Sequence, residues 1–271
     1  MDYESLIAGI KKYGATENDI CMHGLGVSPN QIKEHVIVAP WWEPSVLSGL
    51  GDAESIPTPN HLSSIWNIKN EDFEITYIKT LVGAPMMLEH LIPLGVTSCK
   101  RIIFVGSAGS LHPNIGIGDI VIPESSVCGD GASRYISSGD MTRDVFGETV
   151  HPDSQLHTLL LTETARICNE NKVSWHTGRN FCVDTIAAQF VHLDEIINMG
   201  CNVIEMETAV AFRIAKIMNI PLVALFSISD NVTTNKSLVA GRTQEDMEYR
   251  RFTRKVLFPR IILSVLKSSI L

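Results

Sequence analysis

Two acidic clusters in this 271-residue chain have the composition of a reactive site. In the stretch VIEMETAVAF, Glu205 and Glu207 flank Met206 at the predicted junction of a strand and a helix. A carboxylate accepts two hydrogen bonds, which suits the vicinal hydroxyls of a sugar, and a methionine packs on a sugar ring without competing for them. The same residues are also typical of a helix cap, because acidic side chains favour helix starts.

The second cluster is LFSISDNV, in which Ser229 and Asp230 end an apolar run. Burial at the rim of an apolar pocket raises the pKa of a carboxyl group, so Asp230 is a candidate general acid. The competing interpretation is an Asx turn or a helix cap, which uses the same residue types.

A third candidate is the stretch FVGSAGSLHPNIGIGDIVIP, where an apolar strand runs into four small residues. A loop made of Gly106, Ser107, Ala108 and Gly109 would let backbone amides close on an anion. No lysine or arginine lies within it, so the sequence leaves open whether this predicted loop holds phosphate or a water molecule.

The elements that position these clusters are predicted from apolar periodicity. Strands are expected at HVIVAP, FEITYIKTLVG, RIIFVGSAG, GDIVIP, RNFCVD, CNVIEM and IPLVALFSISD, with helices at APMMLEHLIPLG, HPDSQLHTLLLTETARICNENK and ETAVAFRIAKIMN. Such alternation predicts a largely parallel or mixed sheet covered on both faces, with ligands beyond the carboxyl ends of its strands. All three clusters fall at such ends.

The remaining segments are predicted to be less regular. One short helix and a glycine-containing loop are expected in residues 1–34, turns in PTPNHLSS and NIKNED, and loops in residues 124–150. The tail after Thr243 is expected to be helical and to bend or split at Pro259. Gly95 is predicted to end the helix at APMMLEHLIPLG. We therefore predict an N-terminal extension, residues 1–34, and one catalytic domain, residues 35–271.

Composition excludes several classes of protein. The net charge is −8 and the basic residues are dispersed, which disfavours binding to nucleic acid. The one local basic cluster, at Arg250, Arg251, Arg254 and Lys255, is interpreted as a solvated helix face. No apolar run is long enough to span a bilayer and no signal peptide is evident, so we expect no membrane association and a cytoplasmic location.

Cysteine and histidine spacing predicts neither disulfides nor a metal. The six cysteines form no CxxC pair and are expected to be reduced, mostly buried thiols. His151 and His157 flank a Pro-Asp turn, which is poor geometry for ligands. No GxGxxG opens a helix after a strand, so a dinucleotide-dependent oxidoreductase is disfavoured and no cofactor is expected.

The order and spacing of the motifs resemble the nucleoside phosphorylase and nucleosidase superfamily, which includes purine nucleoside phosphorylase, uridine phosphorylase and methylthioadenosine nucleosidase. The similarity is specific from Val105 to Pro123 and from Val203 to Asp230. It implies an α/β fold, a three-layer α/β/α arrangement of the phosphorylase/hydrolase type with a mixed, barrel-like central sheet. It also implies a homo-oligomer, either a dimer or a hexamer.

The resemblance assigns roles to particular residues. Met206 and Glu207 would grip the ribose of a nucleoside, with Glu205 beside them. Asp230, with Ser229 next to it, would hydrogen-bond or protonate the leaving purine. Ser107 and its neighbours Ala108 and Gly109 would contact the phosphate or the attacking water.

The chain departs from the family pattern at several functional places. Family phosphorylases carry Gly-Asp-Pro and an arginine after the first core strand, where this chain has Trp41, Trp42 and Glu43. They also carry an arginine where this chain has Phe104. Without these guanidinium groups a phosphate dianion is costly to desolvate. Glu43 and Gly106 are therefore candidates for a water or phosphate site.

The family's base-stacking aromatic residue is also absent, because Ile186 stands in its place, and Phe181 or Trp41 are the aromatic alternatives. We therefore expect cleavage of the N-glycosidic bond of a nucleoside, a purine nucleoside in preference, through an oxocarbenium-like ribosyl transition state. The acceptor, inorganic phosphate as co-substrate or water, stays open. The alternative is a catalytically inactive nucleoside-binding protein of the same fold.

Overall fold

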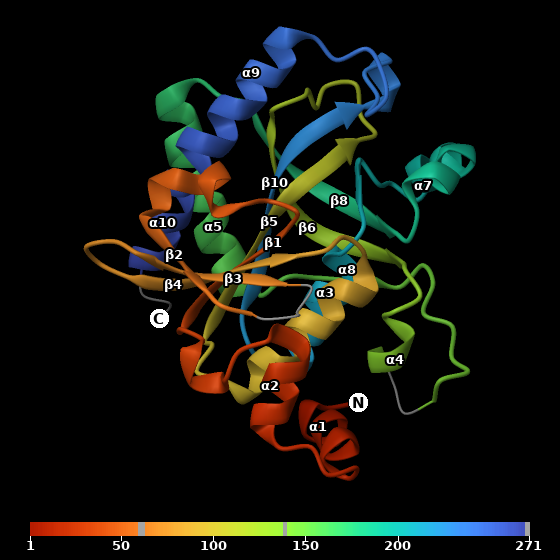
Figure 1. Cartoon of the computed structure of the whole chain (residues 1–271). Coiled ribbons are helices and arrows are strands. Elements are labelled where there is room, and N and C mark those ends of the chain that lie inside the picture. Colours follow the sequence, from red (N-terminus) through yellow and green to blue (C-terminus); the bar gives the residue numbers. More distant parts are fainter. Residues whose placement is uncertain (59–62, 138–139, 269–271) are drawn as a thin grey trace.

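The computed structural model describes residues 1–58, 63–137 and 140–268. Its centre is a mixed sheet of ten strands, and Figure 1 shows helices on both sides of that sheet. Within this sheet, five strands close on themselves into a barrel-like ring. They are β5 (Arg101–Ser110), β10 (Leu222–Asn231), β6 (Ile120–Gly129), β8 (Trp175–Val183) and β9 (Val203–Glu205).

The ring has a defined strand order. β5 pairs in parallel with β10, β10 is antiparallel to β6, β6 and β8 are parallel, β8 and β9 are parallel, and β9 returns antiparallel to β5. The predicted acidic clusters lie at the ends of β9 and β10, and the small residues lie in β5. Closure of the ring therefore brings together segments that are far apart in the sequence.

The other branch of the sheet extends from the first half of β5, where residues 101–104 pair with β1. It contains β1 (His35–Pro40), β4 (Glu74–Thr80), β3 (Ser64–Lys69) and β2 (Asp52–Ile56), in that order. The short strand β7 (Thr149–Val150) pairs with β6. The pairs β2–β3 and β3–β4 are antiparallel, whereas β1 is parallel to both β4 and β5.

The apolar core forms two layers because alternate residues of a strand point to opposite faces. Ile102 and Phe104 of β5 join one core cluster, and Ile103 and Val105 join the other. The first cluster lies under α3 (Ala84–Leu91) and α8 (Thr208–Met218), and the second under α5 (Ser154–Asn171) and α10 (Phe258–Lys267). These packed faces confirm the predicted three-layer α/β/α architecture.

The remaining helices are short. They are α1 (Tyr3–Lys11), α2 (Glu17–Leu25), α4 (Arg134–Ser137), α6 (Ile186–Gln189), α7 (Leu193–Asn198) and α9 (Gln244–Phe252). A π-helical turn at Thr253–Leu257 separates α9 from α10, and Pro259 lies in the first turn of α10, so the predicted irregularity at Pro259 is confirmed. No helix of the described ranges is both long and apolar enough to cross a membrane.

Several local predictions are wrong. Residues 106–109 are not a loop but lie inside β5, where they face β10 in a parallel ladder. The antiparallel pair of β2 and β3 was not expected. β3 includes residues from both segments predicted as turns, PTPNHLSS and NIKNED. Part of the first segment, residues 59–62, lies outside the described residues. α2 replaces a predicted N-terminal loop, and Thr16 caps it with a reciprocal side-chain bond to Asp19.

Gly95 does not end α3 as predicted, since the helix passes into a 3₁₀ turn at Ile92–Val96. A Cβ at Gly95 would lie 2.3 Å from the ring of Tyr3, so glycine is needed there for close packing of α1. The six cysteines are buried and unpaired, which confirms the predicted free thiols.

Candidate functional site

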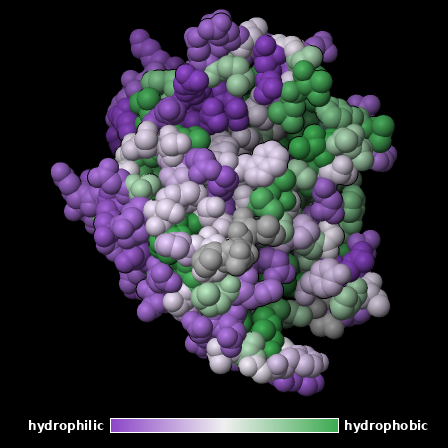
Figure 2. Space-filling model, viewed as in Figure 1, coloured by the Kyte–Doolittle hydropathy of each residue, from purple (hydrophilic) through white to green (hydrophobic). Residues whose placement is uncertain are grey.

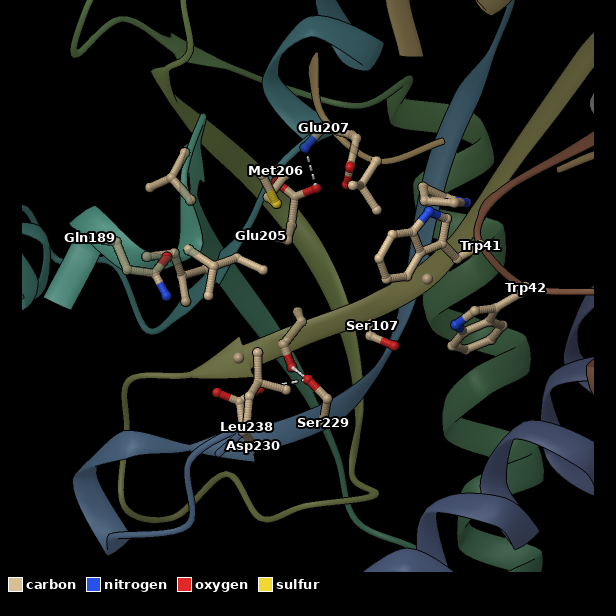
Figure 3. Close-up of a pocket in the computed structure, with 18 of the residues that line it drawn as sticks. Trp41, Trp42, Ser107, Gln189, Glu205, Met206, Glu207, Ser229, Asp230 and Leu238 are labelled. Carbon is tan, nitrogen blue, oxygen red and sulfur yellow. Dashed lines mark hydrogen bonds between the residues drawn. The ribbon is translucent and has the colours of Figure 1, made fainter. Parts of the chain in front are cut away.

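A cavity of about 250 Å³ opens at the ends of β5, β9 and β10 (Figure 3). Most of the predicted site residues line it, namely Gly106, Ser107, Ala108, Gly109, Ile186, Glu205, Met206, Glu207, Ser229 and Asp230. In Figure 3 the Glu205–Glu207 segment forms one wall, and Ser229 and Asp230 form the opposite wall. The volume lies near the lower end of ligand pockets, ~300–1,000 Å³, which suits a compact ligand better than a dinucleotide.

Glu205 anchors the start of α8. Its carboxylate accepts backbone N–H bonds from Glu207 at 2.7 Å and from Thr208 at 2.9 Å, and a side-chain bond from Asn180 at 2.6 Å. Burial raises the pKa of Glu205, and these bonds oppose the rise. The helix-cap interpretation therefore applies to Glu205, which holds the neighbouring Met206 and Glu207 in place.

Glu207 has a different environment. Its Oε1 accepts the backbone N–H of Gly83, which precedes α3, at 2.5 Å. The residue is 5% exposed, and burial together with the adjacent Glu205 raises the pKa of Glu207 above its ordinary value. Hydroxyl donors from a ligand would stabilise the ionised form of this carboxyl group, which makes it suited to bind a sugar diol.

Asp230 is aimed into the cavity by a bulge in β10. The pairing with β5 shifts between Ile228 and Asp230, and such a bulge re-aims the side chains that follow it. Asp230 Oδ1 accepts a hydrogen bond from Ser229 Oγ at 2.6 Å. A Cβ at Gly109 would lie 3.2 Å from Asp230 Oδ2, so the glycine of β5 leaves room for this carboxyl group.

The ionisation of Asp230 reflects competing influences. Burial raises the pKa of Asp230, whereas the Ser229 hydroxyl and the charges of Arg242 and Arg250 lower it. The net direction is upward, because the loss of hydration outweighs the nearby positive charge. A carboxyl group with a raised pKa is the acid that a leaving base requires.

Arg250 is the main site residue that sequence reasoning missed. It was interpreted as part of a solvated helix face, and this is wrong: Arg250 is 8% exposed and lines the cavity. Its Nη2 donates to Ser107 Oγ at 2.6 Å. Arg254 of the same cluster is also drawn inward, with its guanidinium 5.3 Å from the ring of Trp42, whereas Arg251 and Lys255 are exposed as expected.

Two predicted residues lie outside this cavity. Glu43 does not line it and instead forms an ion pair with Lys79 near the surface. Phe181 packs edge-on against Phe146, with ring centroids 6.1 Å apart, in a separate apolar cluster. The structure therefore does not bring either residue to the position where the acceptor or the base was expected.

The two tryptophans after β1 differ in burial. Trp42 is buried against Phe258 of α10, with ring centroids 6.0 Å apart. Trp41 is 65% exposed at the cavity mouth and adopts a φ of 60°, which is uncommon for a residue with a large side chain. Strained residues of this kind gather at ligand sites, so Trp41 is a candidate for an aromatic contact with a ligand.

Apolar side chains also gather on the surface over α6 and α7 (Figure 2). Phe190, Val191 and Ile197 are exposed there, and Ile186 at the cavity is 43% exposed. Contiguous apolar surface of this kind is typical of protein interfaces.

A larger hollow of about 890 Å³ lies on another part of the molecule. Glu148 and Arg213, which both line it, form an ion pair at 3.0 Å, and Glu148 also accepts from Arg143 at 2.5 Å. Across the described ranges no group of three or more histidine, cysteine or acidic side chains could hold a metal ion. The smaller cavity is the candidate site, because the buried Glu207, Asp230 and Arg250 all line it and none of them forms an ion pair within the described residues.

Comparison with known proteins agrees with this geometry. Residues 57–257 match the model of the phosphorylase superfamily. Among characterised sequences, the chain is 26% identical over 144 residues to a DeoD-type purine nucleoside phosphorylase of Roseobacter denitrificans, covering 53% of this chain and 57% of that protein. A second DeoD-type purine nucleoside phosphorylase, from Exiguobacterium sibiricum, is 26% identical over 167 residues, covering 61% of this chain and 67% of that protein.

Solved structures share the fold. A uridine phosphorylase from Vibrio fischeri superposes with a TM-score of 0.72 over 94% of this chain and 99% of that chain, at 19% sequence identity. The same enzyme complexed with 6-hydroxy-1-naphthoic acid gives a TM-score of 0.70, over 91% of this chain and 94% of that chain.

Proposed function

The chain belongs to the phosphorylase superfamily, and we propose that it cleaves the N-glycosidic bond of a purine nucleoside through an oxocarbenium-like ribosyl transition state. The observation that carries this proposal is the pair of buried carboxyl groups, Glu207 and Asp230, on opposite walls of one small cavity. One wall suits a sugar, and the other suits a base that must leave with a proton.

The sugar end of the reaction rests on Met206 and Glu207. The carboxylate of Glu207 accepts the N–H of Gly83, and the backbone of Glu207 is the N-cap position of α8, so the side chain is anchored at both ends. As the bond to the base breaks, positive charge develops on the ribose, and a preorganised carboxylate that binds the ribose hydroxyls stabilises that charge. Met206 lines the same wall and packs on the sugar ring.

The base end rests on Asp230. A purine is a poor leaving group as an anion, so a proton or a strong hydrogen bond at N7 lowers the barrier to its departure. The raised pKa of Asp230 favours the protonated form that can give this proton. The preference for a purine is supported by the two sequence relatives, which are both purine nucleoside phosphorylases.

The contact with the base differs from that inferred for the family. Ile186 opens α6 at the cavity wall and offers an aliphatic surface, and Trp41, which lines the same cavity, supplies an aromatic group. The base would contact both side chains, an arrangement that tolerates more than one purine.

The test is a panel of nucleosides, including inosine, adenosine and uridine, assayed for release of the free base with the full-length protein. We expect release of hypoxanthine or adenine, with loss of activity in Glu207→Gln. The matched control is Glu43→Gln, because Glu43 is a carboxylate outside the cavity. Binding of nucleosides with no release of any base would favour the inactive nucleoside-binding protein and refute the proposal.

A further inference from the structure

Asn180 is a buried amide in β8 that lies behind the wall of the cavity. It is 0% exposed and does not line the cavity itself. Its Oδ1 has no hydrogen-bond partner among the described residues. An unsatisfied buried acceptor destabilises a fold, so an apolar residue would suit this position better unless the donors of the same amide have a use.

Both N–H groups of the Asn180 amide are used. Nδ2 donates to Ser126 Oγ of β6 at 2.9 Å and to Glu205 Oε1 of β9 at 2.6 Å. In the sheet, Asn180 lies opposite Ser126 on one side and Val203 on the other. Glu205 follows Val203 by two residues, so both point to the same face of the sheet. Because a carboxylate only accepts hydrogen bonds, the amide nitrogen has to face Glu205.

Glu205 connects Asn180 to Glu207. Its Oε2 accepts the backbone N–H of Glu207 at 2.7 Å, the bond drawn as a dashed line in Figure 3. The N–H of Thr208 donates to Oε1 of Glu205 at 3.0 Å and to Oε2 at 2.9 Å. Glu207 is the N-cap of α8, and its side chain accepts the N–H of Gly83. The place of Glu207 in the cavity wall therefore depends on Glu205.

The two carboxyl groups differ in how well their charge is stabilised. Glu205 accepts from the backbone of Glu207 and Thr208 and from Asn180, whereas Glu207 accepts the N–H of Gly83. Hydrogen bonds to the ionised form favour it, so Glu205 is the member of the pair that ionises first. Burial and the charge of Glu205 then raise the pKa of Glu207 to about 8.

The groups around Glu205 do not include a cation that could replace these donors. Burial raises the pKa of Glu205, and the hydrogen bonds from Glu207, Thr208 and Asn180 oppose the rise. Cys182 of β8 lies opposite Glu205, and its thiol, whose pKa is raised by burial and by the nearby charges of Glu205 and Asp130, stays neutral. Hydrogen-bond donors therefore keep this buried carboxylate charged.

We propose that Asn180 is a positioning residue, which holds Glu205 as a carboxylate and thereby fixes the start of α8 and the place of Glu207 in the cavity wall. The link from Asn180 to Glu205 stands on the geometry. Its use in catalysis rests on the proposed function, in which Glu207 binds the ribose. Asn180 does not reach the cavity, so it acts only through the two carboxyl groups.

The first experiment compares base release by the full-length wild type, Asn180→Leu and Ser126→Ala. Leucine is close to asparagine in size and has no donor, so kcat/KM should fall about 10- to 100-fold, as expected for loss of a hydrogen bond to a charged group. Most of the fall should appear in kcat, since Glu207 acts on the transition state. Ser126→Ala removes the other bond of the same amide and leaves the bond to Glu205, so its kcat/KM should stay within about threefold of wild type. Equal losses in the two variants, or none in Asn180→Leu, would overturn the proposal.

A double-mutant cycle tests whether Asn180 acts through Glu207. If it does, adding Asn180→Leu to Glu207→Gln should change kcat/KM by less than about threefold, because the charge that Asn180 helps to place is already absent. Losses that multiply would show that Asn180 supports the fold independently of Glu207, and they would refute the positioning role.

Thermal unfolding tests the link to Glu205 without a substrate. Loss of the Asn180 donor should raise the pKa of Glu205 in the folded protein still further above its ordinary value of 4.5. Above that value the unfolded chain releases the proton while the folded protein retains it, so a higher folded-state pKa extends the loss of stability to higher pH. The Tm deficit of Asn180→Leu should therefore grow by about 3 °C or more between about pH 5 and about pH 8. The deficit of Ser126→Ala should not change with pH, and a constant deficit in Asn180→Leu would refute the link.

Asn180→Ser is the second variant if Asn180→Leu does not fold. Serine keeps a small polar group but is too short to reach both Ser126 and Glu205, so the same results are expected. If wild type releases no base from any nucleoside, the proposed function fails, and the pH dependence of Tm alone decides whether Asn180 holds Glu205. If wild type is active while both variants at Asn180 keep wild-type kinetics and a constant Tm deficit, the inference fails and the proposed function stands.

Discussion

Replacing Glu207 by glutamine should weaken catalysis and strengthen the fold at the same time. Glutamine has nearly the same shape, and its amide oxygen can still accept the N–H of Gly83, which now lies 2.5 Å from Oε1. The change removes only the ability of the side chain to ionise and one acceptor. It therefore tests the charge of this side chain and not its packing.

The catalytic loss follows from where that charge acts. An ionised Glu207 stabilises the positive ribose of the transition state more than the neutral ribose of the nucleoside, so its loss raises the barrier. Removal of one such preorganised group costs about 2–4 kcal/mol, which corresponds to a fall in kcat/KM of about 30- to 900-fold. We expect most of the loss in kcat.

The gain in stability follows from the raised pKa of Glu207, whose ordinary value is 4.5. As pH rises above that value, the unfolded chain loses the proton while the folded protein retains it, so the free energy of unfolding of wild type falls. The decline continues until pH passes the raised pKa of the folded state. Glu207→Gln lacks this titration, so its Tm advantage over wild type should grow between pH 5 and neutrality.

The assay pairs steady-state release of the purine base with thermal unfolding at several pH values. Glu43→Gln is the control for both, because that carboxylate is exposed and lies outside the cavity. Wild-type kinetics in Glu207→Gln would refute the ribose assignment. A variant that loses both activity and stability at every pH would show that Glu207 is a structural residue.

The remaining predictions concern the acid, the helix that carries Arg250, and assembly. Asp230→Asn should keep partial activity on inosine, while Asp230→Ala should lose about 10²–10⁴-fold. Wild-type activity should fall as pH rises through the raised pKa of Asp230. Equal, near-wild-type rates for the two variants would make Asp230 a structural residue only. Gly118→Ala should lower the free energy of unfolding by roughly 1–3 kcal/mol, because Gly118 has a φ of 88° and an added Cβ would lie 2.5 Å from Tyr249 and 2.9 Å from the backbone of Arg250. Unchanged stability in calorimetry would contradict this. The protein should be a homo-oligomer by light scattering at micromolar concentration, given the apolar surface over α6 and α7; a fully active monomer would refute this.

Apolar runs in the sequence indicated which residues would line one cavity. Glu207 and Asp230 each come after such a run, and they lie near each other because β9 pairs antiparallel with the end of β5, to which β10 is parallel. The sequence could not separate the roles of Glu205 and Glu207, because a helix cap and a sugar-binding residue use the same residue type at the same place. The structure separates them: Glu205 is bonded to the start of α8 and to Asn180, whereas Glu207 is not.

The role of Arg250 could not be predicted from local pattern. Arg250 lies 143 residues from Ser107, and in the sequence it is one of four nearby basic residues typical of an exposed helix face. The sequence did offer an indirect signal. Arginines are absent from both positions where the family resemblance places them, which indicates that another arginine could line the site. Which of the remaining arginines reaches the strand depends on the packing of α9, and periodicity does not report that.

The packing of β5 explains why the missing arginine cannot simply be restored in its strand. Phe104 is 1% exposed and meets Phe226 of β10 edge-on, with ring centroids 5.0 Å apart. A guanidinium at residue 104 would displace this aromatic pair from the core cluster under α3 and α8. Phe104 therefore contributes to the apolar layer, and residue 104 supplies no cation to Ser107 on the same strand. Arg250 reaches the same serine from the opposite layer, where α9 packs against β10, so the core and the contact with Ser107 are built from different elements.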